Sequence, residues 1–149
     1  MDRRLFILAA VACFPSVLAC NTGEPAQHRE NPRPESLAAL GKELNLQFPA
    51  STRVIGVRRA NGMDDIVRVK LEMASSDLPS LIAQTHIDPA SFYPGTRGLM
   101  GSDKGFWDPN HAPALRTGQV KRPDARALNV GVDDSRPDVA VVYLVEHGT

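Results

Sequence analysis

Cysteine is scarce in this sequence: the two cysteines, Cys13 and Cys20, both lie near the N-terminus. Once that segment is set aside, the remaining chain cannot form an internal disulfide, even in an oxidising compartment that would allow one. We therefore expect the fold to be stabilised by packing.

A surplus of charge of one sign is lacking as well. The chain has 17 Lys and Arg against 17 Asp and Glu, and the basic residues form no cluster. Proteins that bind nucleic acid normally carry a basic patch or stripe. We therefore expect no nucleic-acid partner.

Motifs of known chemistry are also missing. The sequence contains no Gly-x-Ser-x-Gly elbow, no phosphate-binding loop and no dinucleotide fingerprint. The adjacent acids Asp64–Asp65 and Asp133–Asp134 fit turns better than a glycosidase groove, because consecutive side chains diverge. No catalytic residue, cofactor or metal is predicted from a motif, and a non-enzyme is favoured.

A long hydrophobic run is absent, but a short one follows Arg3 and Arg4. It covers Leu5–Ala12 and is broken by Pro15, so it is too short for a bilayer, which takes about 20 apolar residues. A charged start, a short apolar run and a small residue at the end are typical of a secretory signal peptide. We predict that residues 1–19 are such a peptide.

The segment ends in Val17-Leu18-Ala19-Cys20, which resembles the lipobox of bacterial lipoproteins. The resemblance covers this segment only and implies cleavage before Cys20, with acyl chains on that cysteine. Several acyl chains give the stable membrane attachment that a single chain does not. Because Asn21 and not Asp follows the cysteine, the same resemblance implies the outer membrane, facing the periplasm. The alternative is an ordinary secreted protein with Cys20 as a free thiol.

The remaining chain divides into a tether and one domain. Residues 20–34 carry Pro25, Pro32 and Pro34 among polar residues and show no apolar periodicity, so we predict the lipidated cysteine and a flexible tether. Residues 35–149 have the length of a single domain with its own core.

Apolar periodicity predicts the elements of that domain. The strongest signal is the alternation of Val67, Val69, Leu71 and Met73 with charged residues, which is typical of a half-buried strand. The Asn61-Gly62 pair before it predicts an antiparallel hairpin. The expected elements are a helix over 35–46, strands over 52–58 and 66–73, a short helix after 75–77 that ends near Thr85, and strands over 127–132 and 139–145.

The last of these strands is apolar on both faces, so it should lie inside the sheet. Together the elements predict an α+β fold: an antiparallel sheet of about four strands, with one or two helices on one face and a long ordered loop.

The long loop is predicted over 86–125, with a helical turn over 112–117. It is rich in Pro and Gly yet holds four of the eight aromatic residues of the chain, and long loops in compact domains are usually functional or disordered. Aromatic residues on a loop are common anchors for a partner. The alternative is that they pin the loop to the sheet as a second small core. The candidate partner-binding residues are Phe92, Tyr93, Arg97, Phe106 and Trp107.

A weaker candidate site in the same loop comprises His86, Asp88, Asp108 and His111. Two histidines and two carboxylates have the chemistry of a metal site, but their spacing matches no metal motif. Asp88 and Asp108 each precede a proline, which favours turns in which the Asp side chain bonds the backbone. We therefore predict no metal.

The stretch from Trp107-Asp108-Pro109 to Val142-Tyr143-Leu144 is similar to small bacterial envelope lipoproteins of uncharacterised function, a resemblance that implies no activity. The predicted function is a membrane-tethered envelope lipoprotein that binds another envelope protein without catalysis, for example an inhibitor or immunity protein. One alternative is a cell-envelope hydrolase that uses His86, Asp88, Asp108 and His111. The other is a structural envelope component.

Overall fold

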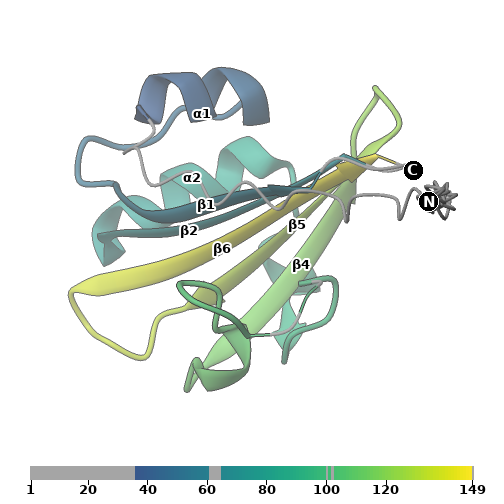
Figure 1. Cartoon of the computed structure of the whole chain (residues 1–149). Helices are drawn as coiled ribbons and strands as arrows, with labels where there is room; N and C mark the ends of the chain where they lie inside the picture. The colour runs from purple at the N-terminus through teal and green to yellow at the C-terminus, as the bar shows by residue number, and fades with distance from the viewer. Residues whose placement is uncertain (1–35, 61–64, 100, 102, 149) are drawn as a thin grey trace, which may run out of the picture.

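The computed structural model describes residues 36–60, 65–99, 101 and 103–148. They form one antiparallel sheet of six strands in the order β1-β2-β6-β5-β4-β3, with two short helices (Figure 1). The predicted α+β class is confirmed. The strands are β1 (Arg53–Ala60), β2 (Ile66–Ala74), β3 (Tyr93–Pro94), β4 (Leu115–Lys121), β5 (Arg126–Asp133) and β6 (Val139–Gly148).

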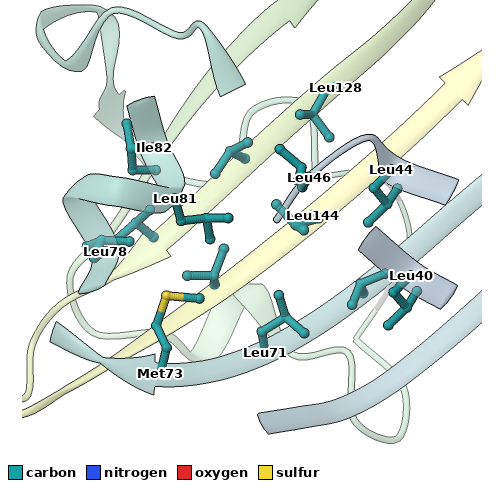
Figure 2. Packing of buried hydrophobic residues seen from close by; sticks show 14 of the residues in the cluster. Leu40, Leu44, Leu46, Leu71, Met73, Leu78, Leu81, Ile82, Leu128 and Leu144 are labelled. Atoms are coloured by element: carbon teal, nitrogen blue, oxygen red, sulfur yellow. The ribbon is translucent and has the colours of Figure 1, made fainter. Parts of the chain in front are cut away.

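The helices α1 (Leu37–Leu44) and α2 (Leu78–Thr85) lie on the same face of the sheet (Figure 1). We call this the helix face. Leu40 and Leu44 from α1 and Leu81 from α2 pack with the large apolar side chains of the central strands, as Figure 2 shows. The alternation of β2 is confirmed, since Val69 and Leu71 are buried in this core and their neighbours are not.

Local signals explain where the two helices begin and end. The side chain of Ser36 accepts a hydrogen bond from the amide of Ala39, and Asn45 ends α1 in a left-handed conformation. Pro79 stands in the first turn of α2, where its missing N–H costs nothing, and His86 ends that helix in the same left-handed way.

The opposite face of the sheet has a core of its own. β6 lies between β2 and β5, which confirms the prediction for the last strand. Its second set of apolar side chains, including Tyr143 and Val145, packs against Leu99 and Trp107. These two residues belong to residues 95–99, 101 and 103–114, which we call the covering loop. The sheet is thus covered by helices on one side and by the covering loop on the other.

The prediction of four strands is an undercount, and the helical turn predicted over 112–117 is wrong. Residues 115–121 form β4, which pairs with β5 along its whole length and with β3 at Arg116 and Thr117. Periodicity did not reveal β4 because two of its buried positions hold Thr117 and Gly118. A Cβ on Gly118 would lie 2.7 Å from the side chain of Ile87, so close packing against this strand requires glycine.

The predicted hairpin strands are confirmed as an antiparallel pair, with a register shift between Val54 and Gly56. The Asn61-Gly62 turn that joins them lies outside the described residues, as do the predicted signal peptide and tether. The expected loop over 86–125 is divided by β3, β4 and the short 3-10 turns Pro89–Ser91 and Pro109–His111.

Candidate binding site

The four residues of the weaker candidate site do not come together. His86 and Asp88 follow α2 on the helix face and are exposed. Asp108 bonds Lys70 and Tyr143, whose side chains lie on the opposite face because their strand neighbours Leu71 and Val142 are in the helix-face core. Within the part of the chain that the structure describes, no group of three or more His, Cys, Asp and Glu could hold a metal ion.

Asp88 and Asp108 use their carboxylates differently. Asp88 accepts a hydrogen bond from the amide of Ala90 at 2.9 Å, which confirms it as a turn residue. Asp108 also starts a turn, since its backbone carbonyl accepts a hydrogen bond from the amide of His111 at 3.0 Å, but its side chain forms no cap bond to that turn. His111 is exposed and lies 3.1 Å from Asp103, a contact between neighbours within the covering loop.

Asp108 is the centre of a polar cluster on the loop-covered face. Its Oδ1 accepts hydrogen bonds from Lys70 Nζ at 2.6 Å and from the hydroxyl of Tyr143 at 2.8 Å. Partial burial acts to raise the pKa of Asp108, but the bonds from Lys70 and Tyr143 outweigh it, so the pKa is lowered. The pKa of Tyr143 is raised, first by burial and then by its bond to Asp108. The cluster therefore contains a carboxylate and a protonated phenol beside the Lys70 side chain, and these three groups fasten the covering loop to the sheet.

Trp107 is fully buried beneath the same loop. Its ring meets the ring of Tyr143 edge-on, with 5.4 Å between centroids, and Phe106 lies next to it at 6.4 Å. Phe106 is half-buried, with the guanidinium of Arg58 5.3 Å from its centroid. Of the two explanations for Trp107, this geometry supports a second small core and leaves no surface of its ring for a partner.

Tyr93 and Arg97 form the accessible part of the predicted set. Tyr93 belongs to β3 at the sheet edge and is half-buried, while Arg97 is exposed and its guanidinium lies 5.1 Å from the Tyr93 ring centroid. The chain turns between them through Gly95, whose φ of 104° suits glycine. We call these two residues the Tyr93–Arg97 stack.

Phe92 packs against the helix-face core, on the opposite face of the sheet from the Tyr93 side chain. It lines a cavity of about 370 Å³. Eight of the lining residues are apolar and one, Arg116, is charged. The lining comprises Leu78, Pro79, Ile82, Ala83, Ile87, Pro89, Phe92, Arg116 and Val132. We call this the α2–β4 cavity. The five predicted partner-binding residues are therefore divided among a buried core, a sheet edge and this cavity.

Arg116 was missed because its segment was interpreted as a helical turn. Once residues 115–121 are taken as a strand, Leu115 and Thr117 point to one face and Arg116 to the other, which places Arg116 beside the helices. The face on which Arg116 lies therefore follows from the strand assignment, which apolar periodicity did not reveal.

A second, more open cleft of about 730 Å³ lies on the helix face along α1. It has polar lining residues, among them Lys42, Gln84 and His86. Gln84 bridges this region by accepting from the amide of Gln47 at 2.7 Å and donating to its carbonyl at 2.9 Å. These bonds join α2 to the segment after α1, so Gln84 has a structural role in this polar cleft.

Cys20, the predicted lipid attachment site, lies outside the described residues. Among the helices that the structure describes, none is long and apolar enough to span a membrane. Comparison of the chain with protein-family models, with curated proteins and with solved structures finds no match.

Proposed function

We propose that this chain is a lipid-anchored protein of the bacterial envelope that binds another envelope protein without catalysing a reaction. The lipobox-like sequence that ends at Cys20 supports the anchor, through its resemblance to bacterial lipoproteins. The Tyr93–Arg97 stack supports the binding function and is the observation that carries it.

The stack has the composition and setting of a protein contact. Tyr and Arg are among the residue types enriched at the energetic centres of interfaces. Tyr93 is held by β3 and is already half-buried, and Arg97 lies against its ring. Part of the ordering cost of binding is therefore met when the chain folds, which favours affinity.

The hydrolase alternative loses its support. It required His86, Asp88, Asp108 and His111 to meet in one cleft, and the sheet separates the first two from Asp108. Asp108 is engaged by Lys70 and Tyr143, and the pair His111–Asp103 lies within the covering loop. A binding function needs no such convergence.

The test is capture from an envelope extract by the full lipidated chain, purified in mild detergent. We expect one envelope protein to be retained at stoichiometric level. Arg97→Ala and Tyr93→Ala should each weaken its binding by about 1–4 kcal/mol. Arg53→Ala is the matched control, because Arg53 is also exposed but lies on β1, at the other edge of the sheet.

Equal retention by all variants would show that the partner does not bind at the stack, and no retention by the wild-type chain would overturn the proposal. If the retained protein is an enzyme or toxin, loss of its activity on addition of the chain would identify an inhibitor or immunity protein. A structural component would instead be retained with envelope material that Tyr93→Ala and Arg97→Ala leave unchanged.

A further inference from the structure

The α2–β4 cavity combines apolar walls with a single positive charge, and we propose that it binds a small amphipathic carboxylate of the medium-chain fatty acid type. The aliphatic chain lies inside the cavity and the carboxylate bonds the guanidinium of Arg116. This inference concerns a small-molecule site and does not depend on the protein partner proposed above.

The walls of the cavity are built from buried apolar side chains. Leu78, Ile82 and Ile87 each have less than a tenth of their surface exposed, yet all three also line the cavity. In Figure 2, Leu78 and Ile82 lie at the margin of the core cluster, whereas Leu81 lies nearer its middle. The volume of about 370 Å³ falls at the lower end of the range for small-molecule sites, about 300–1,000 Å³. The cavity thus offers apolar contact to one small aliphatic group.

Among the described residues that line the cavity, Arg116 alone is charged. Its guanidinium lies 5.9 Å from the ring centroid of Phe92, so it stands over the aromatic wall. A guanidinium has five N–H donors in a planar fork that matches the two oxygens of a carboxylate. An apolar chain that fills the cavity and carries a carboxylate at its end would therefore satisfy both the walls and the charge.

The present partner of Arg116 shows that its guanidinium binds a carboxylate. Arg116 pairs with Asp134 through one nitrogen, Nη2. The two side chains are 41% and 39% exposed, and exposed ion pairs contribute little to stability. A ligand carboxylate can use the other donors of Arg116 or replace Asp134 at small cost.

Other ligand classes fit less well. An uncharged aliphatic molecule would make no ionic contact with the donors of Arg116 that Asp134 leaves open, and a small inorganic anion would leave the apolar walls without contact. A cation with an aliphatic chain would be repelled by Arg116. The combination of wall and charge therefore selects a molecule that has both an aliphatic chain and a negative group.

The test uses the full lipidated chain in phospholipid nanodiscs, with isoleucine methyl groups labelled for NMR and octanoate as the probe. Ile82 and Ile87 line the cavity, whereas Ile66 packs on the other face of the sheet and serves as an internal control. We expect octanoate to shift the Ile82 and Ile87 signals saturably and to leave Ile66 unchanged. Octan-1-ol lacks the carboxylate and acetate lacks the aliphatic chain. Each should bind at least about tenfold more weakly than octanoate.

Two substitutions test the role of the charge. Arg116→Gln should weaken octanoate about tenfold and leave octan-1-ol unchanged, because only the carboxylate contact is lost. Asp134→Asn removes the competing carboxylate and should strengthen octanoate binding. Arg53→Gln should change neither, since Arg53 lies outside the cavity, on β1 at the other edge of the sheet.

An unchanged Ile66 signal shows in each variant that the fold is intact. Absence of a saturable shift at Ile82 and Ile87 would overturn the proposal. Equal affinity for octanoate and octan-1-ol would overturn the assignment of Arg116, as would an Arg116→Gln variant that binds octanoate normally. If Arg116→Gln does not fold, Asp134→Asn decides: unchanged or weaker octanoate binding contradicts the proposal.

Discussion

Two buried threonines differ in how their hydroxyl groups are satisfied. Thr85 donates to the carbonyl of Ile82 at 2.7 Å and accepts from the amide of Ile87 at 3.3 Å, so it closes the end of α2. Thr117 in β4 is fully buried on the loop-covered face, and its hydroxyl has no hydrogen-bond partner among the described residues. A buried hydroxyl without a partner costs free energy, whereas a bonded one does not.

We therefore predict opposite effects for the same substitution at these two positions. Thr117→Val should raise the free energy of unfolding by about 1 kcal/mol, because a methyl group replaces an unsatisfied hydroxyl at nearly constant volume. Thr85→Val should lower it by about 1–2 kcal/mol, because the amide of Ile87 loses its acceptor. Chemical denaturation of the full chain measures both. A Thr117→Val variant less stable than wild type would show that this hydroxyl is satisfied in solution.

The polar cluster around Asp108 leads to a prediction about stability. Asp108→Asn should destabilise the protein by about 1–2 kcal/mol, because Lys70, with only 15% of its side chain exposed, loses its counter-charge. Asp124→Asn is the control, since Asp124 is well exposed and 3.8 Å from Arg126, and should change stability by less than about 0.5 kcal/mol.

The same carboxylate makes stability depend on pH. The pKa of Asp108 is lower in the folded than in the unfolded protein, so its contribution is complete above the ordinary Asp value of about 4. The contribution is lost as the pH falls from there through the folded pKa. Denaturation curves between neutral and acid pH should therefore converge for wild type and Asp108→Asn. Curves that stay parallel down to strong acid would contradict the assigned direction.

Among the elements, the sequence predicted those whose two faces differ clearly or are both apolar. β2 alternates strictly and β6 is apolar throughout, and both were predicted correctly because hydrophobic burial decides their pattern. β4 was missed because close packing places Thr117 and Gly118 where large apolar residues are usual. The two-residue β3 is too short for any periodicity. Its pairing depends on contacts that are distant in sequence.

The candidate site follows the same division. Loop aromatics could be found by composition, but which of them are buried depends on tertiary contacts: Trp107 is enclosed, whereas Tyr93 is only half-buried. The α2–β4 cavity joins residues from α2, from the turn after it and from two strands. No local pattern indicates such a meeting, so the cavity could be seen only in the structure.

The β4–β5 hairpin is fastened to β6 by a buried acid. Glu146 is 2% exposed, and its two carboxylate oxygens bond Arg122 at 2.7 Å and Arg126 at 2.9 Å. The bond between Glu146 and Arg126 raises the pKa of Arg126. Glu146 interrupts the apolar row of β6. Through its two bonds it links the end of β4 and the start of β5 to β6, in the interior of the sheet.

We predict that Glu146→Gln destabilises the protein by about 3 kcal/mol, because it leaves the partly buried charge of Arg122 without a carboxylate. Arg126→Gln should cost clearly less, since Arg126 is 45% exposed and its loss leaves Glu146 paired with Arg122. Thermal unfolding of the two variants compares them directly. Equal losses would indicate that Glu146 makes no special contribution through burial.

The whole molecule is arranged in three layers: two helices, a six-stranded sheet and the covering loop (Figure 1). A sheet that is apolar on both faces needs cover on both, and here irregular chain replaces helices on one side. The Tyr93–Arg97 stack and Arg116 of the α2–β4 cavity come close together at one sheet edge, since Pro94 of β3 pairs with Arg116 of β4. The opposite edge, β1, carries neither.

We also predict that the whole molecule is attached to a membrane. The anchor proposed above is a set of acyl chains on Cys20, and it makes a simple demand. Cys20→Ala should move the protein from the membrane to the soluble fraction and leave the free energy of unfolding of the domain unchanged. Mass spectrometry of the N-terminal peptide should show acyl chains in wild type only. Asn21→Asp is the matched control: it should stay acylated and, by resemblance to enteric lipoproteins, shift toward the inner membrane. A Cys20→Ala variant that remains in the membrane fraction would show that something other than a lipid holds the protein there.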